Sequence, residues 1–313
     1  MLDFPLNFIK YIWYVLTTSY RYGMAIKPYP NTLLPLLLKK LFAPVVNIVD
    51  IDDIDFGYRK GIVSFLSRYM QKPFPRFFDR ITYHNALLKK FILKEYRVKE
   101  NRLLVLKQGV DLKLFHPASK NEKMKKKFIS FFKLKPDVRI LIYTAHLNIA
   151  SDLDILFRHI RPVLSENTYL IIAGGGPLLQ YFKDLVRSLK LPSLYFTGYL
   201  TPEKIIPYIV LSDYALVYYQ DKEVNYYRSS MKLREYLALK KKIISNDVGE
   251  LRLFRPFTYQ SRSDIHDYIS LIKKLLRSRP KDRREEKGYV YVRKHYDWDK
   301  ITEQFVKQLD HVV

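Results

Sequence analysis

Short apolar runs rich in β-branched residues alternate with stretches of helical periodicity along almost the whole chain. A chain that repeats strand, helix and strand in this way folds into a parallel sheet with helices on both faces. Most of the runs are uniformly apolar, as strands buried on both faces must be. Strands are expected at residues 23–27, 45–50, 80–83, 103–106, 139–144, 169–173, 194–197, 214–217 and 242–245. The sequence therefore predicts an α/β protein built on parallel sheets.

A charged segment, HPASKNEKMKKKFISFFKLKPD, follows Phe115 and divides the expected strands into two groups. The chain has 313 residues, which is long enough for two domains of ordinary size. We place the first domain at residues 1–118, a linker at 119–138, the second domain at 139–292 and a closing segment at 293–313. The lysine run at 123–127 could be a nucleic-acid patch. Beside the nearby phenylalanines Phe128, Phe131 and Phe132, we interpret it as the solvated face of a helix.

The chain is strongly basic, with 55 lysines and arginines against 31 aspartates and glutamates and a formal net charge of +24. Such a field attracts phosphates, whether they belong to nucleic acid, anionic lipid headgroups or nucleotide diphosphates, and a basic solvated surface would look the same. There is no cysteine, which excludes disulfides, zinc-thiolate sites and thiol nucleophiles.

The first segment, LDFPLNFIKYIWYVLTTSY, is apolar and aromatic but too short and interrupted for a membrane span. A helix at 5–18 would place one apolar stripe on a single face, made of Phe8, Ile12, Val15 and Leu16. Either this helix packs in the core or it contacts a membrane interface. No transmembrane segment is expected.

Ligands of doubly wound sheets bind where strands end and helices begin, because backbone amides and small residues face the ligand there. One such junction is YLIIAGGGPLLQYF, in which Gly174 and Gly175 follow a buried strand and a helix starts near Pro177. Another is LYFTGYLTPEKI, in which Gly198 ends a strand and Tyr199 stands beside the turn. Both junctions are candidate walls of a ligand site.

A third junction is YYRSSMKLREYLALKKKIISNDVGE, in which Ser229 and Ser230 cap a helix. Lys232 lies two residues after Ser230, so its ammonium and the free helix amides can meet on one diphosphate. Glu235 lies about one turn further along, where a carboxylate can accept both hydroxyls of a ribose.

These junctions, in this order and spacing, resemble the C-terminal domain of family 4 glycosyltransferases of the GT-B fold. That family shows a glycine-rich strand end, a "GY.TPE" segment and a "K..EYLA..K.I...D.GE" segment. The similarity extends upstream to LVLKQGVDLKLFHP and downstream to HYDWDKITEQFVKQL, so it covers about residues 103–309. It implies two Rossmann-like domains facing a cleft, with the second binding a nucleotide sugar. It also implies that the closing segment 293–313 is a helix returning to the first domain.

The resemblance implies roles for single residues. Glu235 would hold the donor ribose, Ser230 and Lys232 would face the diphosphate, and Gly198 with Tyr199 would border the base. Gly174 and Gly175 belong to the glycine-rich strand end that lines the donor cleft. A variant "S..K..EY" form of the family has the same spacing.

Two positions depart from the family pattern. Tyr227 stands where an acidic residue is usual, and the segment TAHLNIASDLD carries His146 where a basic pair is usual. Arg228 and Lys232 are the nearest substitutes, and we expect them to take over phosphate contacts during catalysis.

The first half lacks the opening strand and glycine-rich loop of the family, which predicts a shortened N-terminal domain whose sheet has an exposed edge. A second subunit, a dimer partner or a membrane would cover that edge. Acidic residues cluster near one strand end, at Asp50, Asp52, Asp53 and Asp55. They could bind a metal, but alternate residues point to opposite faces. We assign Asp52 or Asp53 an acceptor-side or catalytic role, expect no metal, and interpret His84 as structural.

The predicted function is transfer of a sugar, with retention, from a nucleotide-sugar donor to a glycan or lipid-linked acceptor. We expect no cofactor besides the donor. The sequence does not decide whether the donor carries uridine or guanosine. We expect a cytoplasmic protein, free or at an anionic membrane surface, and no nucleic-acid partner. The alternatives are a non-catalytic or partner-dependent subunit and a sugar-nucleotide epimerase of the same fold.

Overall fold

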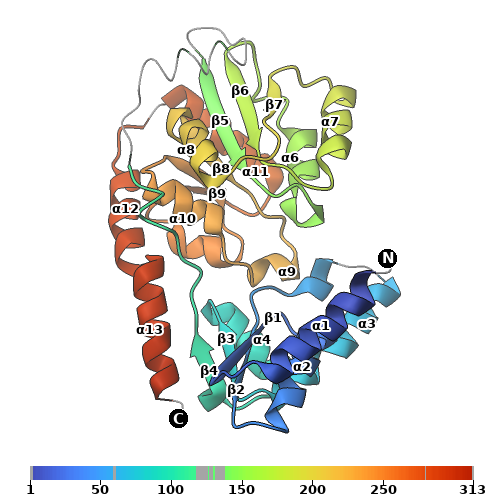
Figure 1. Cartoon of the computed structure of the whole chain (residues 1–313). Helices are drawn as coiled ribbons and strands as arrows, with labels where there is room; N and C mark the ends of the chain where they lie inside the picture. Colours follow the sequence, from blue (N-terminus) through green and yellow to red (C-terminus); the bar gives the residue numbers. More distant parts are fainter. Residues whose placement is uncertain are drawn as a thin grey trace. The chain divides into compact units, whose positions relative to one another are not determined.

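The computed structural model describes residues 3–58, 61–117, 138–278 and 280–311, together with Lys126 and Ser130. The chain divides into two compact units, each built on a parallel sheet (Figure 1). Unit 1 comprises Met1–Lys107, Tyr227–Ser229 and Thr302–Val313. Unit 2 comprises Gln108–Tyr226 and Ser230–Ile301. The two sheets confirm the α/β prediction.

Unit 1 holds a parallel sheet in the order β1-β2-β3-β4. Its strands are β1 (Tyr22–Ile26), β2 (Val46–Asp50), β3 (Arg80–Tyr83) and β4 (Leu103–Val105). Its helices are α1 (Asp3–Thr17), α2 (Pro30–Lys40), α3 (Gly61–Gln71) and α4 (Ala86–Tyr96), with short 3-10 turns η1 (Asp55–Tyr58), η2 (Phe74–Phe77) and η3 (Glu100–Arg102). The sequence order and the spatial order of the strands coincide, so each strand pairs with the next one along the chain.

Unit 2 holds a parallel sheet in the order β10-β9-β8-β5-β6-β7. The strands are β5 (Arg139–Thr144), β6 (Thr168–Ala173), β7 (Leu194–Phe196), β8 (Tyr214–Val217), β9 (Ile243–Asn246) and β10 (Tyr259–Ser261). The helices are α6 (Leu153–His159), α7 (Leu179–Ser188), α8 (Pro202–Leu211), α9 (Glu223–Tyr226), α10 (Met231–Ala238), α11 (Ile265–Ser278) and α12 (Arg284–His295), with η4 (Ile149–Ser151) and η5 (Gly249–Phe254). The strand order reverses between β5 and β8, which is where ligands of such sheets bind.

Alternate residues of β5 fill the two faces of the unit 2 sheet, because side chains of a strand point to opposite sides in turn. Leu141 and Tyr143 belong to the hydrophobic core that also contains residues of α6, α7 and α11. Ile142 belongs to the core on the other face, with residues of α8, α10 and α12. Both cores consist mainly of fully buried aliphatic and aromatic side chains, so the sheet is a rigid base for the loops at its edges.

The nine predicted strands are all present, each with ends within one residue of the prediction. β10 was missed, since three residues carry almost no periodic signal. The helix expected to begin at Pro177 begins at Leu179.

The chain between the two sheets differs from the prediction at its start. Residues from Gln108 group with unit 2, although the first domain was placed up to 118. The cause is local: Val110 pairs with Asp297, and Phe115 packs in the unit 2 core. The predicted linker at 119–138 lies outside the described residues except Lys126, Ser130 and Val138, and the phenylalanines beside the lysine run lie outside them too.

The last helix, α13 (Trp298–Asp310), begins in unit 2 and ends in unit 1. In unit 1, Leu309 packs with Ile48 and Leu104, and the Tyr22 hydroxyl donates to the backbone oxygen of Leu309 at 3.3 Å. The helix therefore completes the core of the first unit. None of the helices within the described ranges is both long enough and apolar enough to cross a bilayer.

Candidate functional site

The three predicted junctions lie at the carboxyl ends of the unit 2 strands, and two of them are joined through their backbones. Gly174, after β6, forms a bridge with Gly198, after β7. A Cβ atom on Gly174 would lie 1.9 Å from the backbone oxygen of Ala145, and one on Gly175 would lie 2.9 Å from the backbone nitrogen of Tyr199. Gly174 also has a φ of +144°. These glycines are required because three loops meet at van der Waals distance.

The turn after β7 presents an aromatic surface. Gly198 has a φ of +75° and no atom within 4 Å of where its Cβ would be, so backbone conformation, not crowding, explains the glycine. Tyr199, which follows it, is 79% exposed. Its ring is free to lie against a flat ligand group such as a nucleotide base.

The N-terminus of α10 forms the second part of the site. Ser230 occupies the N-cap position and is 2% exposed, and its hydroxyl has no hydrogen-bond partner among the described residues. Lys232, in the first turn, holds its Nζ atom 4.0 Å from the ring centre of Tyr143 at the end of β5. The free amides of the first turn, the hydroxyl and the ammonium form an arrangement suited to an anion.

The end of β5 is fixed to α10 by a pair of hydrogen bonds that the sequence analysis missed. The backbone nitrogen of Thr144 donates to the Tyr236 hydroxyl at 2.7 Å, and this hydroxyl donates to Thr144 Oγ1 at 2.9 Å. The Tyr143 hydroxyl in turn donates to the backbone oxygen of Tyr218 at 3.1 Å. These buried bonds hold the end of β5 against α10 and against the loop after β8. Their only sequence signal is tyrosine at otherwise apolar positions.

Glu235 lies on α10, one turn after Lys232. Burial raises the pKa of its carboxyl, and the nearby Lys232 ammonium partly opposes this shift. A carboxylate that has lost much of its water is a strong hydrogen-bond acceptor for sugar hydroxyls. The structure thus brings Ser230, Lys232 and Glu235 together on one short helix.

A buried ion pair supports the start of α10. Arg234 donates to Glu250 Oε1 at 2.8 Å and to the backbone oxygen of Ser230 at 2.9 Å, and both charged side chains are almost fully buried. The guanidinium also lies 4.3 Å from the ring centre of Tyr296. The sequence analysis assigned no role to either residue, although an arginine beside Leu233 on an apolar helix was a signal.

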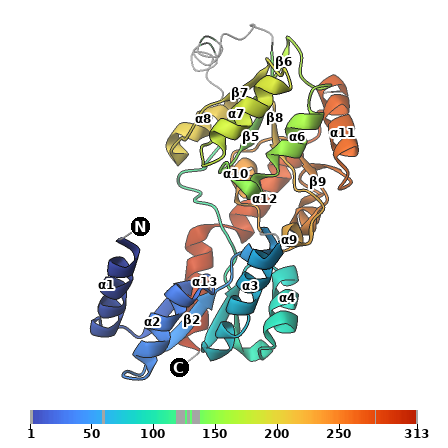
Figure 2. The same cartoon turned by 90° about the vertical axis from the view of Figure 1, so that its right-hand side faces the viewer.

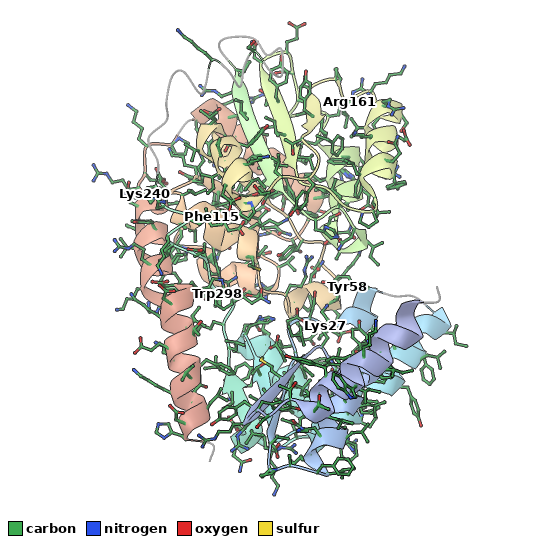
Figure 3. The ribbon with its side chains drawn as sticks, in the orientation of Figure 1. Lys27, Tyr58, Phe115, Arg161, Lys240 and Trp298 are labelled. Atoms are coloured by element: carbon green, nitrogen blue, oxygen red, sulfur yellow. The ribbon has the colours of Figure 1, made fainter. Side chains whose placement is uncertain are left out.

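The predicted catalytic residues Asp52, Asp53 and Arg228 belong to unit 1. The Tyr58 hydroxyl donates to the Asp53 carboxylate at 3.2 Å, and the Arg228 guanidinium lies 5.8 Å from the ring centre of Tyr58. Asp53 and Arg228 are therefore linked through one tyrosine (Tyr58 is labelled in Figure 3). Tyr227, at the position where the family has an acid, packs its ring 4.9 Å from that of Phe91.

Asp52 lies beside Lys27, which follows β1, with Oδ1 3.9 Å from the Lys27 Nζ atom (Figure 3). The backbone oxygen of Asp52 is 2.7 Å from His84 Nε2, and His84 is buried. The His84 ring is thus engaged by the backbone, and its structural role stays a prediction.

Asp50, at the end of β2, accepts a hydrogen bond from the Thr82 hydroxyl. Burial raises the pKa of its carboxyl to about 6, Asp52 adds to the shift, and Thr82 and Lys27 oppose it. Within the described ranges, no group of three or more histidines, cysteines, aspartates or glutamates is arranged to hold a metal ion.

The sequence matches no family model and no curated protein. Solved structures do share its architecture. HepE from Anabaena, in complex with UDP and glucose, is 13% identical, with a TM-score of 0.78 over 98% of this chain and 82% of HepE. Sucrose-phosphate synthase from Thermosynechococcus elongatus is 14% identical, with a TM-score of 0.77 over 99% of this chain and 78% of that enzyme. The chain has the GT-B fold.

The GT-B fold also links the chain to WaaG, a glycosyltransferase involved in lipopolysaccharide biosynthesis. WaaG is 14% identical, with a TM-score of 0.67 over 87% of this chain and 79% of WaaG. The fold expected from the motifs is therefore confirmed as two Rossmann-like units. At these identities the likeness concerns the fold, so residue roles rest on the geometry of the chain itself.

Proposed function

We propose that the chain is a glycosyltransferase of the family 4 type, which moves a sugar from a nucleotide-sugar donor to a glycan or lipid-linked acceptor with retention. The observation that carries this proposal is the start of α10. There Ser230, Lys232 and Glu235 lie on successive turns of one helix beside the strand-order reversal, and the Ser230 hydroxyl has no hydrogen-bond partner within the described part of the chain. The bound UDP of HepE supports the same class of donor.

In the proposed complex the diphosphate lies against the first-turn amides of α10, with Ser230 and Lys232 as side-chain partners. Glu235 accepts hydrogen bonds from the ribose hydroxyls, and the base lies between Gly198 and Tyr199. The contacts made by α10 use a helix whose position is fixed by buried hydrogen bonds to Thr144 and within its first turns. We keep the expectation from the sequence that Arg228 is a further phosphate partner.

The transfer breaks the bond between the anomeric carbon and the diphosphate oxygen and forms one from that carbon to an acceptor oxygen. The acceptor proton leaves with the diphosphate. Negative charge grows on the leaving group, and the Lys232 ammonium and helix amides stabilise it, so the chemistry needs no bound metal in this proposal. Asp52 and Asp53 serve the acceptor side.

A thermal-shift titration of the full chain with UDP, GDP, their sugars and AMP tests the proposal. A ligand present at 100 times its Kd stabilises the folded state by about 2.7 kcal/mol, which is a readily measured shift in Tm. We expect one diphosphate series to shift the Tm and AMP to leave it unchanged. No shift with either diphosphate series overturns the donor site.

Radiolabelled donor then separates the alternatives. Sugar transfer to added acceptor supports the proposal, whereas conversion of the donor without acceptor identifies an epimerase. Donor binding with transfer only after a second protein is added identifies a partner-dependent subunit. The last two outcomes both contradict transfer by this chain alone.

A further inference from the structure

Helix α3 of unit 1 has its polar and apolar sides reversed with respect to the protein. Its exposed side carries large apolar residues at helical spacing, with Ile62 and Tyr69 73% exposed and Phe65 67% exposed. Its inner side carries Ser64 and Gln71, and Gln71 is only 3% exposed. A surface helix of a water-soluble protein normally shows the opposite arrangement.

Specific polar bonds hold α3 in this orientation. The Ser64 hydroxyl donates to the backbone oxygen of Phe56 at 2.8 Å. Arg68 forms an ion pair with Glu95 of α4, and its guanidinium lies 5.6 Å from the Phe56 ring centre. Lys72 reaches the same Glu95 at 3.7 Å. Because the inner contacts are satisfied, the apolar side is turned outward by the fold itself.

Neighbouring helices add to the exposed apolar area. On α1, Ile9, Trp13 and Tyr14 are exposed, although Val15 is buried against the unit. After α2, Leu41 and Phe42 are both more than 70% exposed. α2 contacts α1 and η2, and η2 contacts α3, so these helices form a continuous layer. Figure 2 looks onto α1, α2 and α3.

The net charge of this part of the chain is positive. Residues 1–107 carry 18 lysines and arginines against 8 aspartates and glutamates. Within α1, α2 and α3 the only acid is Asp3, whereas Lys10, Lys40 and Arg68 are exposed bases. Lys40 pairs with Asp79, and Lys39 is buried, where its Nζ atom donates to the backbone oxygen of Leu16. Arg68 and Lys72 both pair with the single carboxylate of Glu95, so this group of three side chains has a net positive charge. Membrane-interface segments typically combine the aromatic residues Trp, Tyr and Phe with the basic residues Lys and Arg.

We infer that α3, with the exposed residues of α1 and the end of α2, inserts into the headgroup region of an anionic bilayer. The basic side chains bind lipid phosphates while the aromatic side chains enter the acyl boundary. This inference deepens the proposed function on its acceptor side by naming the partner surface, and its test does not depend on sugar transfer.

A vesicle experiment tests the inference with matched variants of the full chain. In the double variant Phe65→Ser/Tyr69→Ser, two exposed apolar residues of α3 are removed. In the control, Tyr181→Ser/Leu253→Ser, two exposed apolar residues of unit 2 are removed. Co-sedimentation is measured with vesicles of phosphatidylcholine alone and with added phosphatidylglycerol.

We expect binding to the phosphatidylglycerol vesicles, a loss of at least ~10-fold in the α3 variant, and no loss in the control. The chain has two tryptophans, so a Trp298→Phe chain leaves Trp13 as reporter, and its emission should shift to the blue on vesicle addition. High salt should weaken binding.

Equal vesicle binding by the α3 variant and the unchanged chain overturns the inference, as does binding indifferent to anionic lipid. Sedimentation velocity tests whether a second copy of the chain binds this face instead. A dimer that is lost in the α3 variant, together with no vesicle binding, would show that the face is a dimer interface and overturn the inference. Nucleotide shifts in Tm, recorded on the same samples, report separately on the donor site. Vesicle binding without any nucleotide shift leaves this inference standing and removes the proposed donor chemistry.

Discussion

Arg234 and Glu250 form an ion pair 2.8 Å long that is almost completely removed from solvent in the interior of unit 2. The same guanidinium donates to the backbone oxygen of Ser230, so the pair fixes the start of α10 to the segment that follows β9. The helix turn that is proposed to bind the donor diphosphate is therefore positioned by charges that never contact the ligand.

Replacing only one residue of this ion pair should destabilise the folded chain more than replacing both. Arg234→Met leaves the Glu250 charge buried, and we expect a loss of about 3–5 kcal/mol in the free energy of unfolding. Arg234→Met/Glu250→Met should recover much of that loss. Urea unfolding checks both, with Arg187→Met at an exposed ion pair as control, for which less than about 1 kcal/mol is expected. A double variant as unstable as the single one contradicts the argument.

Lys232 should contribute to donor binding through its charge. We expect Lys232→Met to weaken binding of the nucleoside diphosphate by about 10- to 100-fold, because a charge-assisted hydrogen bond to phosphate contributes roughly 1.5–3 kcal/mol. Isothermal titration measures the affinity, and Lys204→Met on the exposed side of α8 is the matched control. Equal affinities of the two variants would show that the diphosphate binds elsewhere.

Glu235 should make donor binding depend on pH. Burial raises the pKa of its carboxyl, so protonation begins at a higher pH than for an exposed glutamate. A protonated carboxyl accepts ribose hydroxyls poorly, and donor affinity should fall as the pH drops through this raised pKa. Glu235→Gln should bind weakly at every pH and lose this dependence. An affinity profile that keeps its acid limb in Glu235→Gln assigns the effect to another group.

Ionisation of the buried Asp50 carboxyl should lower the stability of unit 1 as the pH rises. The pKa of its carboxyl is about 6 in the folded chain, above the usual value, so folding favours the protonated form. That favourable contribution is complete below the unfolded pKa of about 4 and disappears as the pH passes 6. Relative to the unchanged chain, Asp50→Asn should therefore gain on the order of 2–3 kcal/mol between pH 4 and pH 7.

Chemical unfolding at several pH values measures that difference for Asp50. Asp299→Asn, at an exposed carboxylate, is the control and should show little change with pH. If the Asp50→Asn difference is flat across the range, the carboxyl is solvated in the folded chain and the burial argument fails.

Much of the donor half follows from local sequence. Gly174 and Gly198 mark strand ends because their backbone conformations exclude most side chains, and such constraints are visible in a few neighbouring residues. Ser230, Lys232 and Glu235 come together at the start of one helix for the same reason, since their spacing sets their geometry once the helix forms. The alternation of apolar runs likewise determined the strands and the parallel sheets.

Long-range partners were decided only by the tertiary structure. The residues around Arg234 in the sequence do not predict that it pairs with Glu250. Arg228 and Asp53 likewise both contact Tyr58 although they are far apart in sequence. The outward apolar side of α3 depends on which face meets Phe56 and Glu95, and periodicity alone gives a helix its two faces without saying which one is buried. Local geometry is encoded by adjacent residues, whereas burial is a property of the packed whole.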